Sequence, residues 1–271
     1  MYQSFFGLKE PPFNVTPDPR FIYLSRHHLE ALSTLIYGIR SRRGFIEITG
    51  EIGAGKTTLC RTLLKELQDK VHSAFIFNPK LSELELLQTI VEDLGIAPKG
   101  RRRKDYFDAL NHFLLEELER GMNAILIIDE AQNLSPRSLE QIRLLSNLET
   151  TREKLLQIIL VGQPELRDLL ARPNLAQLQQ RIALRYHLSA LSSEDAGKYL
   201  NHRLQVAGAE EEIFTSEAIQ RIYELSQGIP RLINVLADRA LLAAFVKNSR
   251  MVEAAFVEEA ETDLKGIPLE V

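Results

Sequence analysis

Gly50-Glu51-Ile52-Gly53-Ala54-Gly55-Lys56-Thr57 is the stretch of sequence that decides the fold. It matches the pattern G-x-x-x-x-G-K-[ST], in which backbone N–H groups of a glycine-rich turn surround phosphate groups. The preceding residues 44–49 are β-prone and alternate in polarity, so they predict a strand, and the apolar spacing of residues 57–67 predicts a helix. A strand, a glycine-rich turn and a helix are the context that the motif requires. The sequence therefore predicts a nucleotide-binding protein of the α/β class.

Every position of this loop is a candidate contact to the nucleotide. The Lys56 ammonium is expected to reach the β- and γ-phosphates, and the Thr57 hydroxyl is expected to bind Mg²⁺. The N-terminus of the following helix adds partial positive charge. The guanine signature N-K-x-D is absent from the sequence, so ATP is the expected nucleotide. The predicted nucleotide-binding residues of the loop are Gly50, Glu51, Ile52, Gly53, Ala54, Gly55, Lys56, Thr57 and Thr58.

The composition is that of an ordinary globular protein. The 271 residues are 45% hydrophobic and 26% charged, and the net charge of −4 gives no general reason to expect nucleic acid. The single cysteine, Cys60, excludes an internal disulfide and suits a reducing compartment. No apolar run reaches the length of about 18 residues that a membrane helix needs, and residues 1–10 do not resemble a signal peptide. A cytoplasmic protein is expected.

A second chemical motif follows the apolar run Ala124–Ile128, which is typical of a central parallel strand buried on both faces. Asp129 and Glu130 come directly after it, where open α/β sheets bind their ligands. Asp129 is expected to hold Mg²⁺, directly or through water. Glu130 is the candidate base that polarises the attacking water. An acidic pair at this place favours an ATPase class with a catalytic glutamate over the GTPase class.

Three further polar residues are candidates for catalysis. Gln163 directly follows the predicted strand 155–162 and could position water or satisfy a turn. Arg181 and Arg185 flank the start of the last predicted strand. Either one could reach the γ-phosphate in a neighbouring subunit as an arginine finger, or form a local salt bridge instead.

From Ser192 onward the pattern is entirely helical. Pro230 and Arg231 begin the long helix of this region, and Arg231 could reach the γ-phosphate or form a packing salt bridge. Residues 1–190 are therefore predicted to be an arm followed by an ATPase core, and residues 191–271 a helical lid domain. The predicted helix N-caps are Ser25, Ser82, Ser135, Ser192 and Thr215.

Residues 1–25 are rich in proline and aromatic residues, which predicts an extended arm. The arm, through Tyr23, could form one wall of an adenine pocket, or it could be a hydrophobic clasp without ligand contact. Residues 99–104 hold the densest positive charge of the chain and could meet nucleic acid or acidic lipid, or remain a solvated loop. No aromatic residues interleave with this stretch, so a stacking platform is not indicated.

Together these pieces resemble the AAA+ ATPases, with Gln163 at the sensor-1 place, Arg181 at the finger place and Arg231 at the sensor-2 place. Gln163 departs from the asparagine or threonine that is usual there. The loop, the acidic motif Asp129–Leu134 and the opening residues Phe5–Leu24 further resemble the general secretion pathway protein A family. Related pilus-biogenesis and exopolysaccharide-locus ATPases are similar as well.

The resemblance implies a P-loop NTPase core with a mostly parallel five-stranded sheet flanked by helices, followed by a small all-α lid. It implies Mg²⁺-dependent ATP hydrolysis that serves assembly or switching in a bacterial secretion, pilus or envelope export system. The implied partners are further copies of the chain, with a nucleotide-dependent ring as one form, and a membrane-anchored envelope protein. Two alternatives stay open: a DNA-associated ATPase related to transposition-accessory proteins, and a nucleotide-gated adaptor with little turnover.

Overall fold

The computed structural model describes residues 2–14, 18–68 and 70–265, and the chain divides into two compact units. The unit that we call the sheet unit consists of His27–Gly50 and Leu59–Leu188. The other, which we call the helical unit, consists of Met1–Arg26, Glu51–Thr58 and Ser189–Val271. Pro17 of the predicted arm and residues 266–271 of the predicted lid domain lie outside the described residues.

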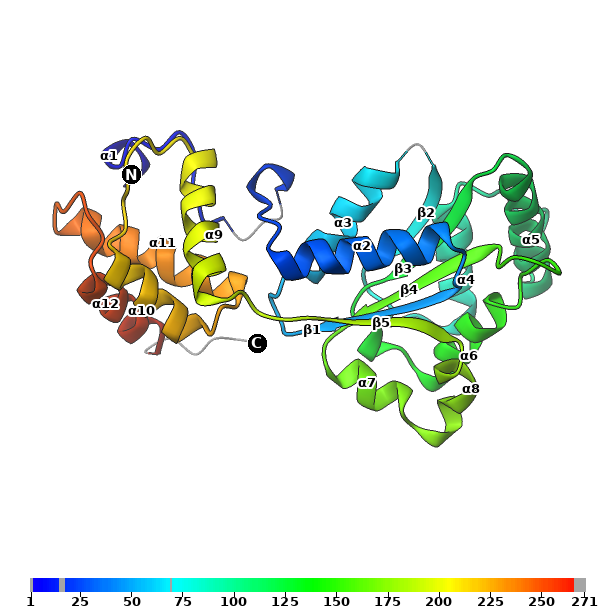
Figure 1. The fold of residues 1–271 in the computed structure, drawn as a ribbon. Helices are drawn as coiled ribbons and strands as arrows, with labels where there is room; N and C mark the ends of the chain where they lie inside the picture. The colour runs from blue at the N-terminus through cyan, green and yellow to red at the C-terminus, as the bar shows by residue number, and fades with distance from the viewer. Residues whose placement is uncertain (1, 15–17, 69, 266–271) are drawn as a thin grey trace. The chain divides into compact units, whose positions relative to one another are not determined.

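The sheet unit is built on five strands in the order β2-β3-β4-β1-β5 (Figure 1). Every pairing between neighbouring strands is parallel, which explains the near-continuous apolar sequence of β3 and β4. The predicted five-stranded sheet is confirmed. The strands are β1 (Phe45–Gly50), β2 (Val71–Ile76), β3 (Asn123–Ile128), β4 (Leu156–Gly162) and β5 (Ile182–Leu188).

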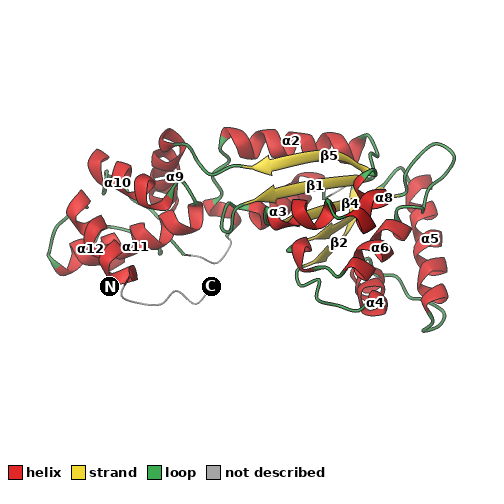
Figure 2. Cartoon of the chain, turned by 90° about the horizontal axis from the view of Figure 1, so that it is seen from below, coloured by secondary structure: helices red, strands yellow, loops and turns green. Residues whose placement is uncertain are grey.

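Helices cover both faces of this sheet (Figure 2). Phe45 and inward-facing residues of β2, β3 and β4 share one hydrophobic cluster with helices α4 to α8. Successive strand residues point to opposite faces, so Ile46 points to the other face. On that face α2 packs closely against β1. A Cβ atom added to Gly38 of α2 would lie only 2.5 Å from Ile46 Cδ1, so the close packing requires glycine there. The helices are α2 (Arg26–Arg40), α3 (Lys56–Leu67), α4 (Glu83–Asp93), α5 (Arg103–Glu119), α6 (Pro136–Leu145), α7 (Glu165–Leu170) and α8 (Ala176–Gln179), with the 3₁₀ turns η2 (Ala131–Asn133) and η3 (Pro173–Leu175).

Four of the predicted helix N-caps make the expected hydrogen bonds. The Ser82 side chain accepts from the backbone N–H of Glu85, whose carboxylate accepts from the N–H of Ser82 in turn. The side chains of the other three accept from the third residue of α6, α9 and α10 respectively; they are Ser135, Ser192 and Thr215. These short-range patterns determine where the helices begin, because they satisfy N–H groups that lack a partner within the helix.

The helical unit holds α9 to α12 and the N-terminal arm around one hydrophobic core. Apolar residues of the arm belong to that core, and they include Phe6, Leu8, Phe13 and Phe21. No helix in the described part of the chain is both long and apolar enough to cross a membrane. The elements are α1 (Tyr2–Phe5), η1 (Pro19–Phe21), α9 (Ser193–Val206), α10 (Ser216–Ser226), α11 (Pro230–Val246) and α12 (Ala254–Lys265).

The grouping of the arm differs from the prediction, which joined residues 1–25 to the ATPase core. The physical reason is that the arm's buried aromatic side chains pack against α9 and its neighbours in the helical unit. The hydrophobic clasp expected as one alternative is therefore present. Its partner is the C-terminal part of the chain.

Arg203 of α9 fastens the arm to this core. Its Nε donates to the carbonyl oxygen of Pro12 at 2.6 Å, and its Nη2 donates to that of Asn14 at 3.0 Å. The guanidinium also lies 5.0 Å from the ring centroid of Phe21. Only 7% of Arg203 is exposed, so these contacts are made largely away from water. The low dielectric constant of the protein interior strengthens them.

Replacing Arg203 by alanine should therefore release the arm. The change leaves two arm carbonyl groups without their charged donor, which should lower the free energy of unfolding by about 2–4 kcal/mol. Urea unfolding measures the loss, and limited proteolysis should cut the variant first between residues 2 and 14. Lys198→Ala is the matched control on α9, because its ion pair with Glu194 is exposed and should contribute less than about 0.5 kcal/mol. Equal stabilities of the two variants would contradict the assignment.

Candidate nucleotide site

The parallel sheet gathers the ends of three strands at one edge. The register pairs Thr49 of β1 with Gly162 of β4, and Ile128 of β3 with Leu160 of β4. Parallel strands all end at the same edge, so the chain leaves β1, β3 and β4 there. The predicted loop, the predicted acids and Gln163 follow these three strands. This is the edge at which open α/β sheets bind ligands.

The loop itself, residues 51–58, belongs to the helical unit. Gly53 and Gly55 have φ angles of +81° and +97°, which side chains disfavour and glycine allows. The Ala54 N–H donates to the carbonyl oxygen of Glu51, which closes the turn. The same oxygen accepts from Lys56 Nζ at 2.9 Å, so the lysine side chain is folded back along the loop.

The two threonines follow Lys56 in the first turn of α3 and are partly exposed. Ala54 is buried and Ile52 is 47% exposed. Gly50 is the last residue of β1. The structure therefore has the strand, turn and helix that the sequence predicts for this motif, with Thr57 and Thr58 at the helix start.

Within the helical unit, the start of α11 lies against this loop. The Arg231 N–H donates to the carbonyl oxygen of Gly53 at 3.4 Å. A Cβ atom on Gly53 would lie 2.5 Å from Arg231 Cβ, so the approach requires glycine. Pro230 occupies the first position of the helix. The Arg231 side chain is exposed and makes no salt bridge with any residue that the structure describes, so the packing salt bridge expected as an alternative is not observed.

Tyr23 lies against α9 in the same unit. Its hydroxyl donates to Asp195 Oδ1 at 2.9 Å, and its ring packs near Tyr199 and His202. Burial, and then the hydrogen bond to Asp195, raises the pKa of the Tyr23 phenol to about 12, so the group stays protonated and continues to donate. The hydroxyl is thus occupied within the protein, and a contact between the ring and a nucleotide stays a prediction.

The acidic pair lies at the end of β3 in the sheet unit. Asp129 is 4% exposed, and its Oδ1 accepts from the N–H of Glu130 at 2.9 Å. Glu130 has a φ of +51°, a left-handed conformation that is uncommon for glutamate and often marks functional sites. This turn directs the chain from β3 into η2.

Two side-chain amides hold the Glu130 carboxylate. Gln132 Nε2 donates to Glu130 Oε2 at 2.6 Å, and Gln163 Nε2 donates to the same oxygen at 3.2 Å. The structure therefore brings together Glu130 and Gln163, both of which the sequence predicts as catalytic. Sequence reasoning missed Gln132 as a site residue. Its position two residues after the glutamate was the only available signal, and that position alone does not show where the side chain points.

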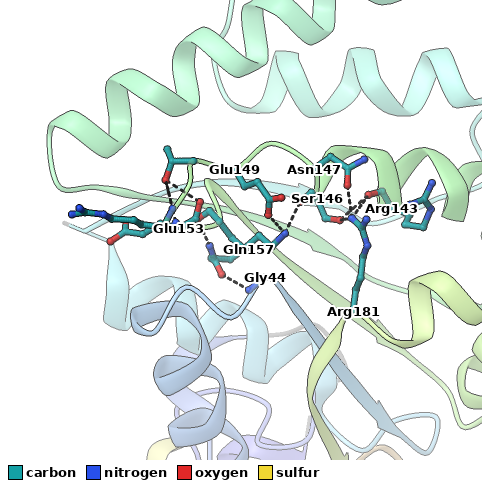
Figure 3. Close-up of polar contacts among 11 residues, drawn as sticks. Gly44, Arg143, Ser146, Asn147, Glu149, Glu153, Gln157 and Arg181 are labelled. Atoms are coloured by element: carbon teal, nitrogen blue, oxygen red, sulfur yellow. Dashed lines mark hydrogen bonds and ion pairs between the residues drawn. The ribbon is translucent and has the colours of Figure 1, made fainter.

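The two candidate finger arginines are both bound within the sheet unit. Arg181 Nη1 donates to the Arg143 carbonyl oxygen at 3.2 Å, to Ser146 Oγ at 2.5 Å and to Asn147 Oδ1 at 2.6 Å (Figure 3). It thereby caps the C-terminal end of α6, because it donates to a carbonyl oxygen of the last turn and to the C-cap residue Ser146. Arg185 donates to the buried carboxylate of Glu47 at 3.0 Å. The local salt bridge expected as the alternative is present for Arg185, whereas Arg181 makes local hydrogen bonds to uncharged groups instead.

Comparison with known proteins agrees with this geometry. Residues 39–170 match the sequence model of a family described as AAA domain. The chain is 47% identical over 268 residues to general secretion pathway protein A of Aeromonas hydrophila, an alignment that covers 98% of this chain and 49% of that protein. It is 29% identical over 210 residues to the ATP-dependent target DNA activator B of Escherichia phage Mu, covering 76% of this chain and 62% of that protein. This chain thus spans about half to two thirds of the length of these relatives.

A solved structure supports the fold. The Aeropyrum pernix ORC2 protein, in ADPNP and ADP complexes, superposes with a TM-score of 0.71 at 19% identity, covering 97% of this chain and 73% of that one. An identity this low shows the fold alone. Residues 39–170 thus resemble AAA domains, the chain shares its fold with the ORC2 protein, and it is similar to general secretion pathway protein A along nearly its whole length.

Proposed function

We propose that the chain hydrolyses Mg²⁺–ATP bound at the loop after β1, with Glu130 as the base that orients the attacking water. The observation that carries this proposal is the anchored carboxylate of Glu130 at the edge where β1 passes into the loop. A carboxylate held by two amides keeps a fixed direction, which general-base catalysis needs. In this proposal Lys56 and the loop N–H groups bind the phosphates, and Arg231 binds the γ-phosphate.

The donor atoms suit Mg²⁺ bound together with ATP. Among the described residues, no group of three or more His, Cys, Asp or Glu side chains could hold a metal ion by itself. Mg²⁺ commonly takes one or two protein oxygens, and phosphates and water supply the rest. The Thr57 hydroxyl and the Asp129 carboxylate are hard oxygen ligands of this kind. Bound Mg²⁺ would offset charge that develops on the phosphates.

Within the sheet unit, Arg181 lies at the edge opposite to the one from which the chain enters the loop. Ile182, its neighbour, pairs with Phe45 at the start of β1, whereas the loop follows the end of that strand at Gly50. A strand rises about 3.3 Å per residue, so β1 separates these edges by about 17 Å. We therefore infer that Arg181 acts on ATP held by another copy, and that the active form is a homo-oligomer.

The biological setting that we propose rests on the similarity to the Aeromonas hydrophila protein. General secretion pathway protein A is 47% identical to this chain, which favours an assembly or switch ATPase for a secretion, pilus or envelope export system. Its partner in this proposal is a membrane-anchored protein of such a system, and the ATPase works on the cytoplasmic side. ATP binding or hydrolysis would then drive a change in the assembly of that partner.

Glu130→Gln should separate binding from hydrolysis. The amide keeps the size of the side chain but cannot accept a proton, so ATP should bind normally while turnover falls by about 10²–10⁴-fold. Isothermal titration with ATP and a phosphate-release assay measure the two quantities. Glu119→Gln, at an exposed position that ends α5, is the control and should keep normal turnover. Retained turnover in Glu130→Gln would remove Glu130 from the mechanism.

Mixing two inactive variants tests the role of Arg181. Lys56→Ala should not bind ATP, and Arg181→Ala should bind ATP without hydrolysing it. A mixture should show a turnover well above the sum of the turnovers of the two variants measured alone. The reason is that Lys56→Ala supplies the arginine and Arg181→Ala supplies the ATP site. The matched mixture of Lys56→Ala with Glu130→Gln should stay inactive, since a base must act in its own site. If the first mixture also stays inactive, Arg181 has only its structural role.

A DNA-associated ATPase is the second candidate, and two observations favour it. The phage Mu relative, 29% identical, is named an ATP-dependent target DNA activator. In residues 99–104, Arg102 pairs with Asp105 and Arg103 lies near Glu83, whereas Lys99, Arg101 and Lys104 are exposed and make no salt bridge within the described chain.

If DNA is the partner, duplex DNA should stimulate turnover and the stimulation should fall steeply with salt. Each phosphate contact contributes about 0.9 to the slope of log affinity against log salt concentration. Replacing Lys99, Arg101 and Lys104 together by alanine should flatten that slope and leave turnover without DNA unchanged. A DNA-independent turnover at low salt would exclude this candidate.

A further inference from the structure

Gln132 connects the end of β3 to the end of β4 through its side chain. Its Oε1 accepts from the backbone N–H of Gln163 at 3.1 Å, and its Nε2 donates to Glu130 Oε2 at 2.6 Å. The residue itself lies in the short turn η2, one residue past the start at Ala131. A single amide group thus touches both the candidate base and the backbone beside the candidate sensor.

The direction of this amide is determined by its partners. A backbone N–H can only donate, so the Gln132 atom that faces Gln163 must be the oxygen. The nitrogen then faces Glu130, whose ionised carboxylate only accepts. Neither partner would tolerate a flipped amide. Gln132 is therefore a fixed donor to one oxygen of the glutamate.

Only one oxygen of Glu130 is occupied in this way. Both amide donors reach Oε2, and no described residue forms a hydrogen bond with Oε1. A carboxylate fixed through one oxygen presents the other in a defined direction. That second oxygen can accept a proton from water.

We propose that Gln132 is a positioning residue for hydrolysis, which holds Glu130 so that Oε1 can accept the proton of the attacking water. The inference rests on the proposed role of Glu130 as the base. Gln132 needs no contact with the nucleotide for this role. It acts through Glu130 alone.

The two amides have different parts in this arrangement. The bond from Gln132 is short at 2.6 Å, whereas the bond from Gln163 is long at 3.2 Å and the weaker of the two. Gln132 is therefore the stronger of the two donors that hold the carboxylate. The Gln132 oxygen also fixes the backbone from which the Gln163 side chain extends.

Gly162 provides the space for this bridge. A Cβ atom there would lie 2.6 Å from Gln132 Oε1 and 3.0 Å from Leu166 Cδ2. Any side chain at this last position of β4 would push the amide away from Gln163. Gly162→Ala is thus a second way to disturb the bridge, with the Gln132 side chain still present.

The test replaces Gln132 by methionine, which has similar length but no amide. We expect kcat for ATP hydrolysis to fall about 10- to 100-fold, a change of about 1.4–2.7 kcal/mol in the barrier. The dissociation constant of ATP and the melting temperature should stay close to those of the parent chain. Gln177→Met on α8 is the matched control at an exposed position, and its kcat should be unchanged.

Combination with Glu130→Gln shows whether Gln132 acts through the glutamate. The double variant should hydrolyse ATP no more slowly than Glu130→Gln alone, because a positioning residue has no effect once the base is gone. Additive losses, or an unchanged or raised kcat in Gln132→Met, would overturn the proposal. If Gln132→Met lowers the melting temperature strongly, Gln132→Ala and Gly162→Ala are tested in its place. Each must lower kcat about 10- to 100-fold, and neither may lower kcat further when it is combined with Glu130→Gln.

The turnover of Glu130→Gln tests the proposed base independently of Gln132→Met. If Glu130→Gln retains turnover, the proposed base is wrong, whatever Gln132→Met does. If Glu130→Gln loses turnover and Gln132→Met does not, Glu130 remains the base and the inference about Gln132 fails. The two proposals therefore fail in distinguishable ways.

Discussion

Parallel pairing between β3, β4 and β1 is the constraint on which the site depends. Glu130 and Gln163 are 33 positions apart in the sequence, yet they share a hydrogen bond because both follow strands that end at one edge. A slip of β4 by one residue would turn its side chains to the opposite face. It would also move the Gln163 N–H away from Gln132. The register of the sheet therefore determines the chemistry as well as the core.

The helical unit depends on an interaction of another kind. Its core contains residues from both ends of the chain, and the buried guanidinium of Arg203 donates to two carbonyl groups of the arm. The loop residue Gly53 meets the first turn of α11 in the same unit. A side chain at that glycine would separate the loop from Arg231. Arm, loop and α11 thus form one packed body, although long stretches of sequence separate them.

The sequence predicts local features of this fold well and non-local ones less well. The caps at Ser82 and Thr215 depend on residues within one helical turn, so their pattern suffices to predict the helix starts. The apolar run before Asp129 likewise identifies a buried strand from a few neighbouring residues. Placement of the arm on α9, in contrast, depends on contacts across most of the chain. The Gln132 bridge depends on strand order and on the missing side chain at Gly162, which no local pattern reveals.

Arg181 closes the end of α6 with three hydrogen bonds, and this has a consequence for association between copies. An arginine already satisfied within its own chain must break those bonds before it can meet another phosphate. If Arg181 acts on ATP held by another copy, as proposed, the free energy of that exchange opposes association, so a higher protein concentration is needed to reach the same degree of assembly.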